Sequence, residues 1–312
     1  MDFPVEPLRA FAAVIDAGTF DAAARRLGIT PSAVSQRIRA LERQAGTVVV
    51  RRSHPAEPTE AGHVLLRLAR QVELVAQDAQ ASLAALGESG SGHDGGPAAP
   101  ARSHLTVVVP ADSLAGWFAP VLAAAADEES LTLEILRDDE NASAEHLRAG
   151  RAMGAVTTQA APVQGCAVVE LGSLSYAAVA NRDFAERWFG GSAECDPAGF
   201  ARAPVMHFDR TDPLQSQLIE RLTPGARPPA HYVPDSMQFA AAIGAGLGWG
   251  LLPRWQVEHL RATGDDVVPL GGHTAAVKLY WQRWRLDSPG LTWLTDTVRY
   301  AASTSLGSAR HG

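Results

Sequence analysis

Four polar residues in the first part of the chain have side chains and a spacing suited to contact with nucleic acid. They are Ser32, Ser35, Gln36 and Arg39, which occupy positions i, i+3, i+4 and i+7. That spacing places all four on one face of a helix. Their hydroxyl, amide and guanidinium groups hydrogen-bond base edges and phosphates. Because a small helical domain of any function also exposes serine and arginine, the spacing alone leaves a merely solvated surface as the alternative.

Three short helices are expected to hold this face in position. The first carries apolar residues at helical spacing, namely Leu8, Phe11, Ala12 and Ile15. The second is expected over 20–27, because Thr19 can cap its start and Gly28 can end it. The third begins at Thr30 and Pro31, a capping hydroxyl followed by proline at the first helical position. Two short helices joined by a tight turn have the layout of a helix-turn-helix, whose second helix enters the major groove of DNA.

A β-branched segment over 48–52 follows the third helix and predicts one strand of a small hairpin. Its two arginines are placed to hold flanking phosphates. The residues expected to contact DNA are therefore Pro31, Ser32, Ser35, Gln36, Arg37, Arg39, Arg51 and Arg52.

The charge of the chain is unevenly distributed. The whole chain has a formal net charge of -7, which by itself argues against nucleic acid. Residues 1–70, however, carry ten arginines against seven acidic residues, whereas residues 87–312 carry 17 basic and 25 acidic residues. This asymmetry indicates a basic module attached to an acidic one.

Length and composition indicate a cytoplasmic globular protein of two or three domains. The chain has 312 residues, of which 46% are apolar. It contains no uninterrupted apolar run of 18 residues, and no basic-then-apolar signal at its start, so neither a membrane span nor secretion is expected. The two cysteines, Cys166 and Cys195, are too few for a disulfide framework or a four-sulfur zinc site.

A long helix beginning near Thr59 carries a narrow apolar seam at steps of four and three residues. The seam consists of Ala61, Leu65, Leu68, Val72, Val75, Ala79, Ser82 and Leu86. A helix that lies on the core of its own domain is one interpretation. We favour a coiled-coil dimer interface, because a core helix usually has a wider apolar face. The residues predicted at that interface are Leu65, Leu68, Val72, Val75 and Ala79.

The pattern changes after a stretch rich in glycine and serine. Short apolar runs then alternate with helical patterns, which predicts parallel α/β sheets. Strands are expected over 105–109, 131–136 and 155–157, and helices over 113–126 and 144–149.

Several features that resemble enzyme motifs do not fit them. The glycines over 244–250 follow a helical run and precede a strand-like pair, the reverse of a dinucleotide loop. His207 has no second ligand at metal spacing, and 172–175 is not a nucleophile elbow. Trp281 and Trp284 are expected in the core. The chain is therefore expected to be no enzyme and to hold no cofactor or metal.

Residues 20–42 and 58–62 resemble the helix-turn-helix and the start of the linker helix of LysR-type transcriptional regulators. The resemblance covers essentially the whole chain. It implies an α/β protein with an N-terminal all-α winged helix-turn-helix, a dimerising linker helix and a periplasmic-binding-protein-like effector domain of two α/β lobes. The expected domains are a winged helix-turn-helix over 1–58, a linker helix over 59–87, a flexible linker over 88–103, an effector domain over 104–303 and a tail over 304–312. Within the effector domain, the first lobe is expected at about 104–166 and 270–303, and the second at about 167–269.

Four further segments are similar to the branch of this family that contains ArgP and LysG. They are 111–118, 154–159, 162–166 and 279–284. The resemblance implies a regulator that senses L-lysine or L-arginine and controls an exporter gene. It also implies a homodimer or homotetramer on double-stranded promoter DNA, with RNA polymerase as a partner and no membrane association. The alternatives are a regulator of the same architecture with an unrelated effector, and a chromosome-binding protein that affects replication initiation. The segment 235–239 is less serine-rich than this branch leads us to expect.

A basic amino acid as effector needs donors for its carboxylate and carboxylates for its cationic groups. Asp112 and Ser113 stand where a strand gives way to a helix, where backbone N–H groups attract anions; an ionised Asp112 suits an amino group instead. The other residues expected to bind the effector are Asp138, Asp139, Thr157, Thr158, Asp209, Asp235 and Ser236. For any one of these, a solvated carboxylate or a turn-capping threonine is the alternative.

Overall fold

The structure, a computed structural model, describes residues 3–88 (side chains to residue 83), 102–138, 143–190 and 196–307. Of the residues predicted above, Asp139, the side chain of Leu86 in the seam and most of the linker 88–103 lie outside this part. The chain folds into two compact units. The first unit is Met1–Val109, Val121–Val169 and Tyr280–Val298; the second is Pro110–Pro120, Glu170–Leu279 and Arg299–Gly312. Among the described helices, none is long and apolar enough to span a membrane.

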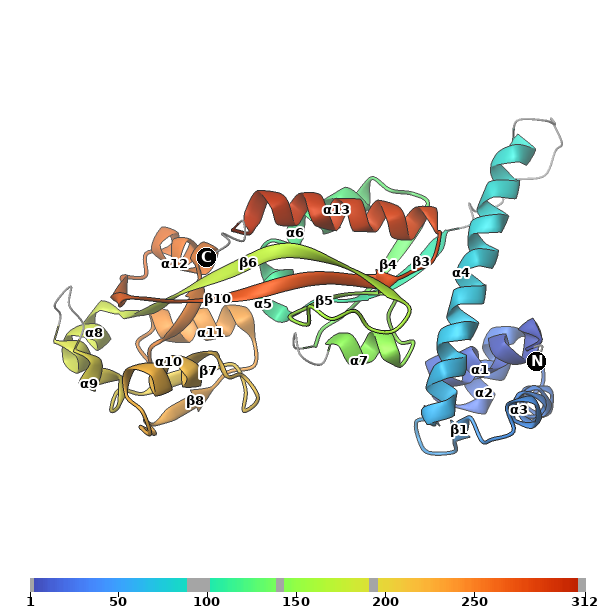
Figure 1. The fold of residues 1–312 in the computed structure, drawn as a ribbon, viewed down its shortest axis with the longest axis horizontal. Coiled ribbons are helices and arrows are strands. Elements are labelled where there is room, and N and C mark those ends of the chain that lie inside the picture. The colour runs from blue at the N-terminus through green and yellow to red at the C-terminus, as the bar shows by residue number, and fades with distance from the viewer. Residues whose placement is uncertain (1–2, 89–101, 139–142, 191–195, 308–312) are drawn as a thin grey trace. The chain divides into compact units, whose positions relative to one another are not determined.

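The first unit begins with three helices that pack around one apolar core (Figure 1). They are α1 (Val5–Ala17), α2 (Phe20–Leu27) and α3 (Pro31–Ala45). The side chains of Thr19 and Thr30 accept backbone hydrogen bonds at the starts of α2 and α3. Glycines in the left-handed conformation end the three helices, Gly18 after α1, Gly28 after α2 as predicted, and Gly46 after α3.

A small wing follows α3. The strands β1 (Val50–Arg51) and β2 (Glu57–Pro58) pair antiparallel, so the predicted strand over 48–52 is shorter than expected. Thr59 then caps α4 (Glu60–Glu88) by accepting from the backbone N–H of Gly62 at 3.0 Å. A Cβ at Gly62 would lie 2.2 Å from the carbonyl oxygen of Val49, so glycine is needed where α4 passes the wing.

The rest of the first unit, which we call the first lobe, is built on a mixed sheet. In it β3 (Ser103–Val108) lies parallel to β4 (Leu131–Leu136) and β5 (Gly154–Thr157), whereas the end of β10 (Val267–Trp284) runs antiparallel to β5. The three strands predicted here, β3, β4 and β5, are parallel as expected, whereas the antiparallel pairing of β10 was not predicted, because this strand returns from the C-terminal part of the chain. Trp281 and Trp284 on β10 are buried in the core. The helices of this lobe are α6 (Ala119–Ala126), α7 (Ser143–Arg148) and the larger part of α13 (Pro289–Ser305).

The second unit contains two further strand pairs and is called the second lobe. Here β6 (Cys166–Asn181) pairs antiparallel with β9 (Gly250–Pro253), and β7 (Val205–His207) pairs parallel with β8 (Ala230–Tyr232). Its helices are α5 (Ala111–Ala115), α8 (Arg182–Phe189), α9 (Pro197–Phe200), α10 (Leu214–Leu222), α11 (Ser236–Gly244) and α12 (Arg254–Thr263).

The single helix predicted over 113–126 was wrong, since α5 and α6 are separate. Gly116 ends α5 with φ -119° and ψ -105°. A Cβ at this position would lie 2.4 Å from Nε1 of Trp255. The indole of α12 thus occupies the space that a side chain on a continuous helix would need.

Candidate functional site

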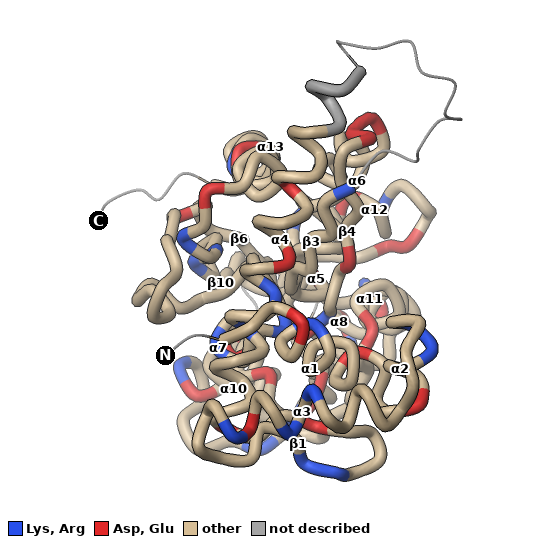
Figure 2. The backbone as a smooth tube through the Cα atoms, turned by 90° about the vertical axis from the view of Figure 1, so that its right-hand side faces the viewer, with Lys and Arg blue, Asp and Glu red and all other residues tan. Residues whose placement is uncertain are grey.

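The outer surface of α3 presents most of the polar side chains that its spacing predicted. Pro31, Ser32, Gln36 and Arg39 are exposed, and Ser35 is partly exposed. Lys and Arg positions lie along α3 and at β1 (Figure 2). An exposed hydroxyl, an amide and a guanidinium on one helix face have the hydrogen-bonding groups that read base edges in a major groove.

Arg37 differs from its neighbours on α3. Its Nη1 lies 2.9 Å from Oε2 of Glu6 on α1, so this arginine forms an ion pair within the helical bundle. Arg51 and Arg52 on the wing are exposed, and the guanidinium of Arg52 stacks over the ring of Phe20 at 5.4 Å. Assignment of these arginines to DNA stays a prediction, and Arg51 is the one most open to a phosphate.

A buried polar cluster in the second lobe centres on Asp112 of α5. Oδ2 of Asp112 accepts a hydrogen bond from Oη of Tyr176 on β6 at 3.0 Å. Oδ1 accepts one from Oγ of Ser236 on α11 at 2.5 Å. Nε2 of Gln256 on α12 donates to both the carbonyl oxygen and Oγ of Ser236, each at 2.9 Å. We call Asp112, Tyr176, Ser236 and Gln256 the Asp112 cluster.

Burial raises the pKa of Asp112 above the usual value of an aspartate, although the hydrogen bonds from Ser236 and Tyr176 act in the opposite direction. The nearby carboxylate of Asp212 raises the pKa further. An incompletely solvated carboxylate gains from a cationic partner, because Coulomb attraction is stronger where water is excluded. The Asp112 cluster is therefore a place for an ammonium or guanidinium group.

Ser113 lies next to Asp112 and is completely buried. Its hydroxyl has no hydrogen-bond partner among the described residues, and neither has the indole Nε1 of Trp255. Buried polar groups are usually paired, so an unpaired hydroxyl beside Asp112 is a free donor for a ligand. The helix dipole contributes little here, since α5 has only five residues.

Two other predicted aspartates of the second lobe are engaged by their own loops. Asp209 accepts from the backbone and the hydroxyl of Thr211, and these bonds lower its pKa. Asp235 is exposed and caps α11 by accepting from the N–H groups of Met237 and Gln238. A role for either in binding an effector stays a prediction, while local turn geometry already explains both carboxylates.

The predicted residues of the first lobe lie at the ends of β4 and β5. Asp138 follows β4, and its Oδ2 is 2.7 Å from Nε2 of His146 on α7. Thr157 is buried at the end of β5, and its hydroxyl accepts from the N–H of Gln159 at 3.1 Å. Thr158 follows it and is partly exposed.

Sequence analysis missed Tyr176 and Gln256, which complete the Asp112 cluster. Tyr176 stands 64 positions and Ser236 stands 124 positions from Asp112 along the chain. No periodic pattern links such distant residues. In the structure, burial alternates along β6 and turns Tyr176 inward, but the sequence itself carries no signal that pairs this residue with Asp112.

The predicted dimer residues of α4 fall into two groups. Leu65 belongs to the core of the N-terminal helices, and Leu68 packs against it. Val75 and Ala79 are exposed, and Val72 is partly exposed. An interface between copies of the chain would therefore involve Val75 and Ala79 more than Leu65, and it stays a prediction.

Family models match both halves of the chain. Residues 5–63 match the bacterial regulatory helix-turn-helix protein, lysR family, and residues 98–303 match the LysR substrate binding domain. The HTH-type transcriptional regulator LysG of Mycobacterium bovis is 43% identical over 297 residues, which covers 95% of this chain and 92% of that protein. The lysine export transcriptional regulatory protein LysG of Corynebacterium efficiens is 40% identical over 295 residues, covering 94% and 96%.

Solved structures agree with the family models. The crystal structure of ArgP from Mycobacterium tuberculosis superposes with a TM-score of 0.82 at 41% identity and covers 99% of both chains. Full-length LysG from Corynebacterium glutamicum with bound effector Arg superposes with a TM-score of 0.76 at 37% identity, covering 97% of this chain and 99% of that one. Together with the winged helix-turn-helix and the two α/β lobes, these matches show that the chain belongs to the LysR family of bacterial transcriptional regulators.

Proposed function

We propose that this protein is a DNA-binding transcriptional regulator that responds to L-lysine or L-arginine and controls an amino-acid exporter gene. The observation that carries the proposal is the Asp112 cluster, a partly buried carboxylate beside an unpaired buried hydroxyl in the second lobe. The two groups match the ammonium and the carboxylate of an amino acid. Similarity to a LysG structure with bound arginine supports this choice of effector.

The DNA-binding part of the proposal rests on α3 and the wing. Gln36 and Arg39 supply base-reading groups on one exposed helix face, and Arg51 supplies a phosphate contact. Binding of the effector changes the relative stability of two arrangements of the subunits. The shift between these arrangements changes the placement of their DNA-binding helices. Contact with RNA polymerase, which the family resemblance implies, is part of the same proposal.

The subunits associate through the exposed apolar residues of α4. Val64, Val75 and Leu83 are 69%, 47% and 67% exposed in the single chain. Exposed apolar residues spread along a long helix are available to pack against a second copy of that helix. We expect Val75→Asp to dissociate the dimer on a sizing column with light scattering, whereas Leu122→Asp, an exposed site on α6, leaves it intact. A Val75→Asp protein with the mass of the wild type contradicts this interface.

Thermal unfolding of the full-length protein with amino acids tests the effector. A ligand at 100 times its dissociation constant stabilises a protein by about 2.7 kcal/mol, which a melting curve resolves. We expect lysine or arginine to raise Tm, and norleucine and citrulline, which lack the charged end group, to leave it unchanged. If neither basic amino acid raises Tm, the effector belongs to another chemical class.

A gel-shift titration tests the DNA-binding part. We expect promoter DNA of an exporter gene to bind at least 1,000-fold tighter than unrelated DNA of equal length. Equal affinity for both would instead favour a chromosome-binding protein.

A further inference from the structure

Helix α4 presents three different faces to its surroundings. Successive helical residues are about 100° apart, which sorts its side chains into three rows. The row in the core of the N-terminal helices is Leu65, Leu66 and Ala69. The row that contacts the first lobe is His63, Arg67, Arg70, Gln77 and Asp78. The exposed apolar row contains Val64 and Val75, which lie within about 20° of one another around the helix axis. One helix thus joins the DNA-binding helices to the first lobe.

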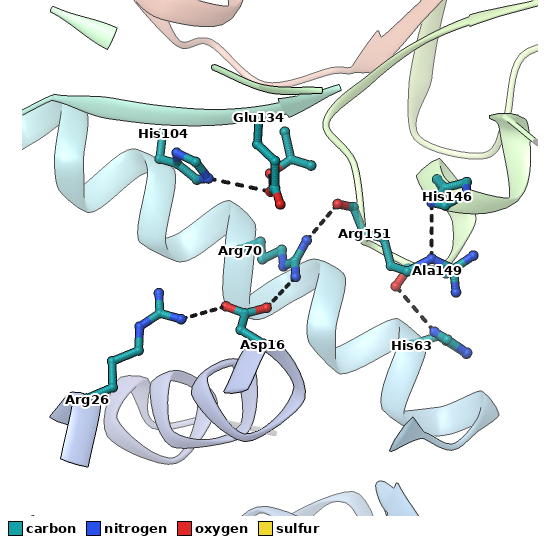
Figure 3. A network of polar contacts seen from close by, with 10 residues as sticks. Asp16, Arg26, His63, Arg70, His104, Glu134, His146, Ala149 and Arg151 are labelled. Carbon is teal, nitrogen blue, oxygen red and sulfur yellow. Dashed lines mark hydrogen bonds and ion pairs between the residues drawn. The ribbon is translucent and has the colours of Figure 1, made fainter. Parts of the chain in front are cut away.

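Arg70 contacts both of these partners with one guanidinium group (Figure 3). Its Nη2 lies 2.6 Å from Oδ1 of Asp16 on α1. Its Nη1 donates to the carbonyl oxygen of Arg151 in the first lobe at 2.7 Å. The other oxygen of Asp16 pairs with Nη1 of Arg26 on α2 at 3.3 Å. Because the guanidinium is planar and its donors are fixed relative to one another, the two contacts of Arg70 hold α1 and the lobe in one geometry.

The turn after α7 fits closely against α4 around Arg70. A Cβ at Gly150 would lie 2.6 Å from the backbone nitrogen of Arg67, and φ of this glycine is +69°. The carbonyl oxygen of Ala149 lies 3.3 Å from Nδ1 of His63, one turn along the helix. Nη1 of Arg67 also donates to the carbonyl oxygen of Gln164 at 2.7 Å. Backbone groups of the lobe therefore meet α4 directly, with no space for a side chain at Gly150.

The contact continues from the turn to the C-terminal end of β4, where Asp138 is partly exposed. Nε of Arg151 donates to Nδ1 of His146 at 3.2 Å, so the ring proton of His146 resides on Nε2. That Nε2 donates to Oδ2 of Asp138 at 2.7 Å. Asp138 follows β4 and is among the residues proposed above to bind the effector. A continuous polar chain thus links Asp138 to Arg26 of the helix-turn-helix.

We propose that Arg70 is a coupling residue that makes the first lobe and the helix-turn-helix move as one body. When the effector changes the position of the first lobe, the guanidinium of Arg70 transmits the change to α1 and α2 through Asp16. Hydrogen-bond networks carry such coupling when both partner sites bias the same element. The contact itself does not depend on the proposed effector, whereas its regulatory consequence rests on the proposed function.

Hydrogen–deuterium exchange of the full-length protein tests the contact. We compare the wild type with Arg70→Met, Arg70→Lys and, as a matched control, Arg148→Met, whose arginine makes only exposed contacts, to Glu145 on α7 and to Gln159 after β5. We expect Arg70→Met to increase exchange in both 60–75 and 146–152, and Arg70→Lys to do so less, since one ammonium group retains the charge but not the fork. Arg148→Met is expected to leave both segments unchanged. Unchanged exchange at 146–152 in Arg70→Met would overturn the proposal.

The ratio of promoter affinities with and without arginine tests the consequence. Coupling between sites in regulators typically corresponds to a 5- to 150-fold ratio. We expect Arg70→Met and Arg70→Lys to bring this ratio toward 1, while calorimetry shows affinity for arginine within about threefold of the wild type. A wild-type ratio in both variants contradicts the coupling role. If no basic amino acid binds the wild type, the proposed function fails, and hydrogen exchange still decides whether the contact exists.

Discussion

The outer face of α3 and the Asp112 cluster are both polar, but they are assembled in opposite ways. The groups on α3 come from one helix and are exposed to solvent. The groups of the Asp112 cluster come from α5, β6, α11 and α12, and all except Asp112 are buried. Local spacing creates the first site, whereas the tertiary fold creates the second. Truncation of a hydrogen-bond donor is therefore expected to lower stability little on α3 and more in the cluster, where loss of the Ser236 or Tyr176 hydroxyl leaves Asp112 without one of its partners.

Asp112→Asn should produce the largest effect, because it removes the charge and keeps the shape. We expect the affinity for lysine or arginine, measured by calorimetry, to fall on the order of 100-fold. Promoter affinity without effector should stay unchanged. Asp196→Asn is the matched control, since that exposed carboxylate caps α9 in the same lobe. Equal losses in both variants would place the cationic group of the effector elsewhere.

Gln36→Ala should have a smaller and more selective effect. Loss of one base contact costs about 1–3 kcal/mol, and at the lower end of this range affinity falls roughly 5- to 10-fold, with relaxed preference at one base pair. A gel-shift series over single-base variants of the promoter measures it. Gln80→Ala, at an exposed glutamine of α4, is expected to change nothing. If selectivity is unaltered in Gln36→Ala, this side chain does not read a base.

Arg51→Ala should weaken binding by a few fold on every sequence. A phosphate contact carries no sequence information and releases counterions, so its loss reduces the slope of log affinity against log salt by about 1. Filter binding at several salt concentrations gives this slope. Arg148→Ala should retain the wild-type slope. A loss confined to one sequence would mean that Arg51 contacts a base.

The smallest expected effect is on the melting temperature, which should depend on pH in a variant of the Asp112 cluster and not in a variant of α3. Burial raises the pKa of Asp112 in the folded state, so this group stabilises the fold below the usual pKa of aspartate and that contribution is lost as pH rises through the raised value. Asp112→Asn should therefore melt at a higher temperature than the wild type above that pH, and the difference should shrink in acid. Gln36→Ala should follow the wild type at every pH in the same calorimetric scans.

Elements with local sequence signals were predictable, whereas elements that depend on distant residues were not. The helix-turn-helix was predictable because its signals are local: Thr30 caps α3, Pro31 is its first residue and Gly46 ends it. The break between α5 and α6 was not, since Trp255, a distant residue, occupies the space beside Gly116. The mixed sheet of the first lobe was missed for the same reason, because β10 comes from the end of the chain.

The candidate effector site shows the same limit. Asp112 and Ser236 were both selected from the sequence, and the structure joins them by a hydrogen bond. Their partners Tyr176 and Gln256 carry no sequence signal, because only the fold brings them near. Asp235 was also selected, because it is acidic and precedes a helix. In the structure it caps α11, and this role alone explains an acidic residue at that position.

The three rows of α4 restrict how its length can change. Insertion of one residue near position 72 would turn every later side chain by about 100°, close to the angle between neighbouring rows. Gln77 and Asp78, which meet the first lobe, would then rotate away from it, while Val75 would leave the exposed apolar row. An insertion of seven residues would restore the phase to within about 20°. The length of α4 is therefore restricted: it tolerates only insertions and deletions that leave each row of side chains facing its present partner.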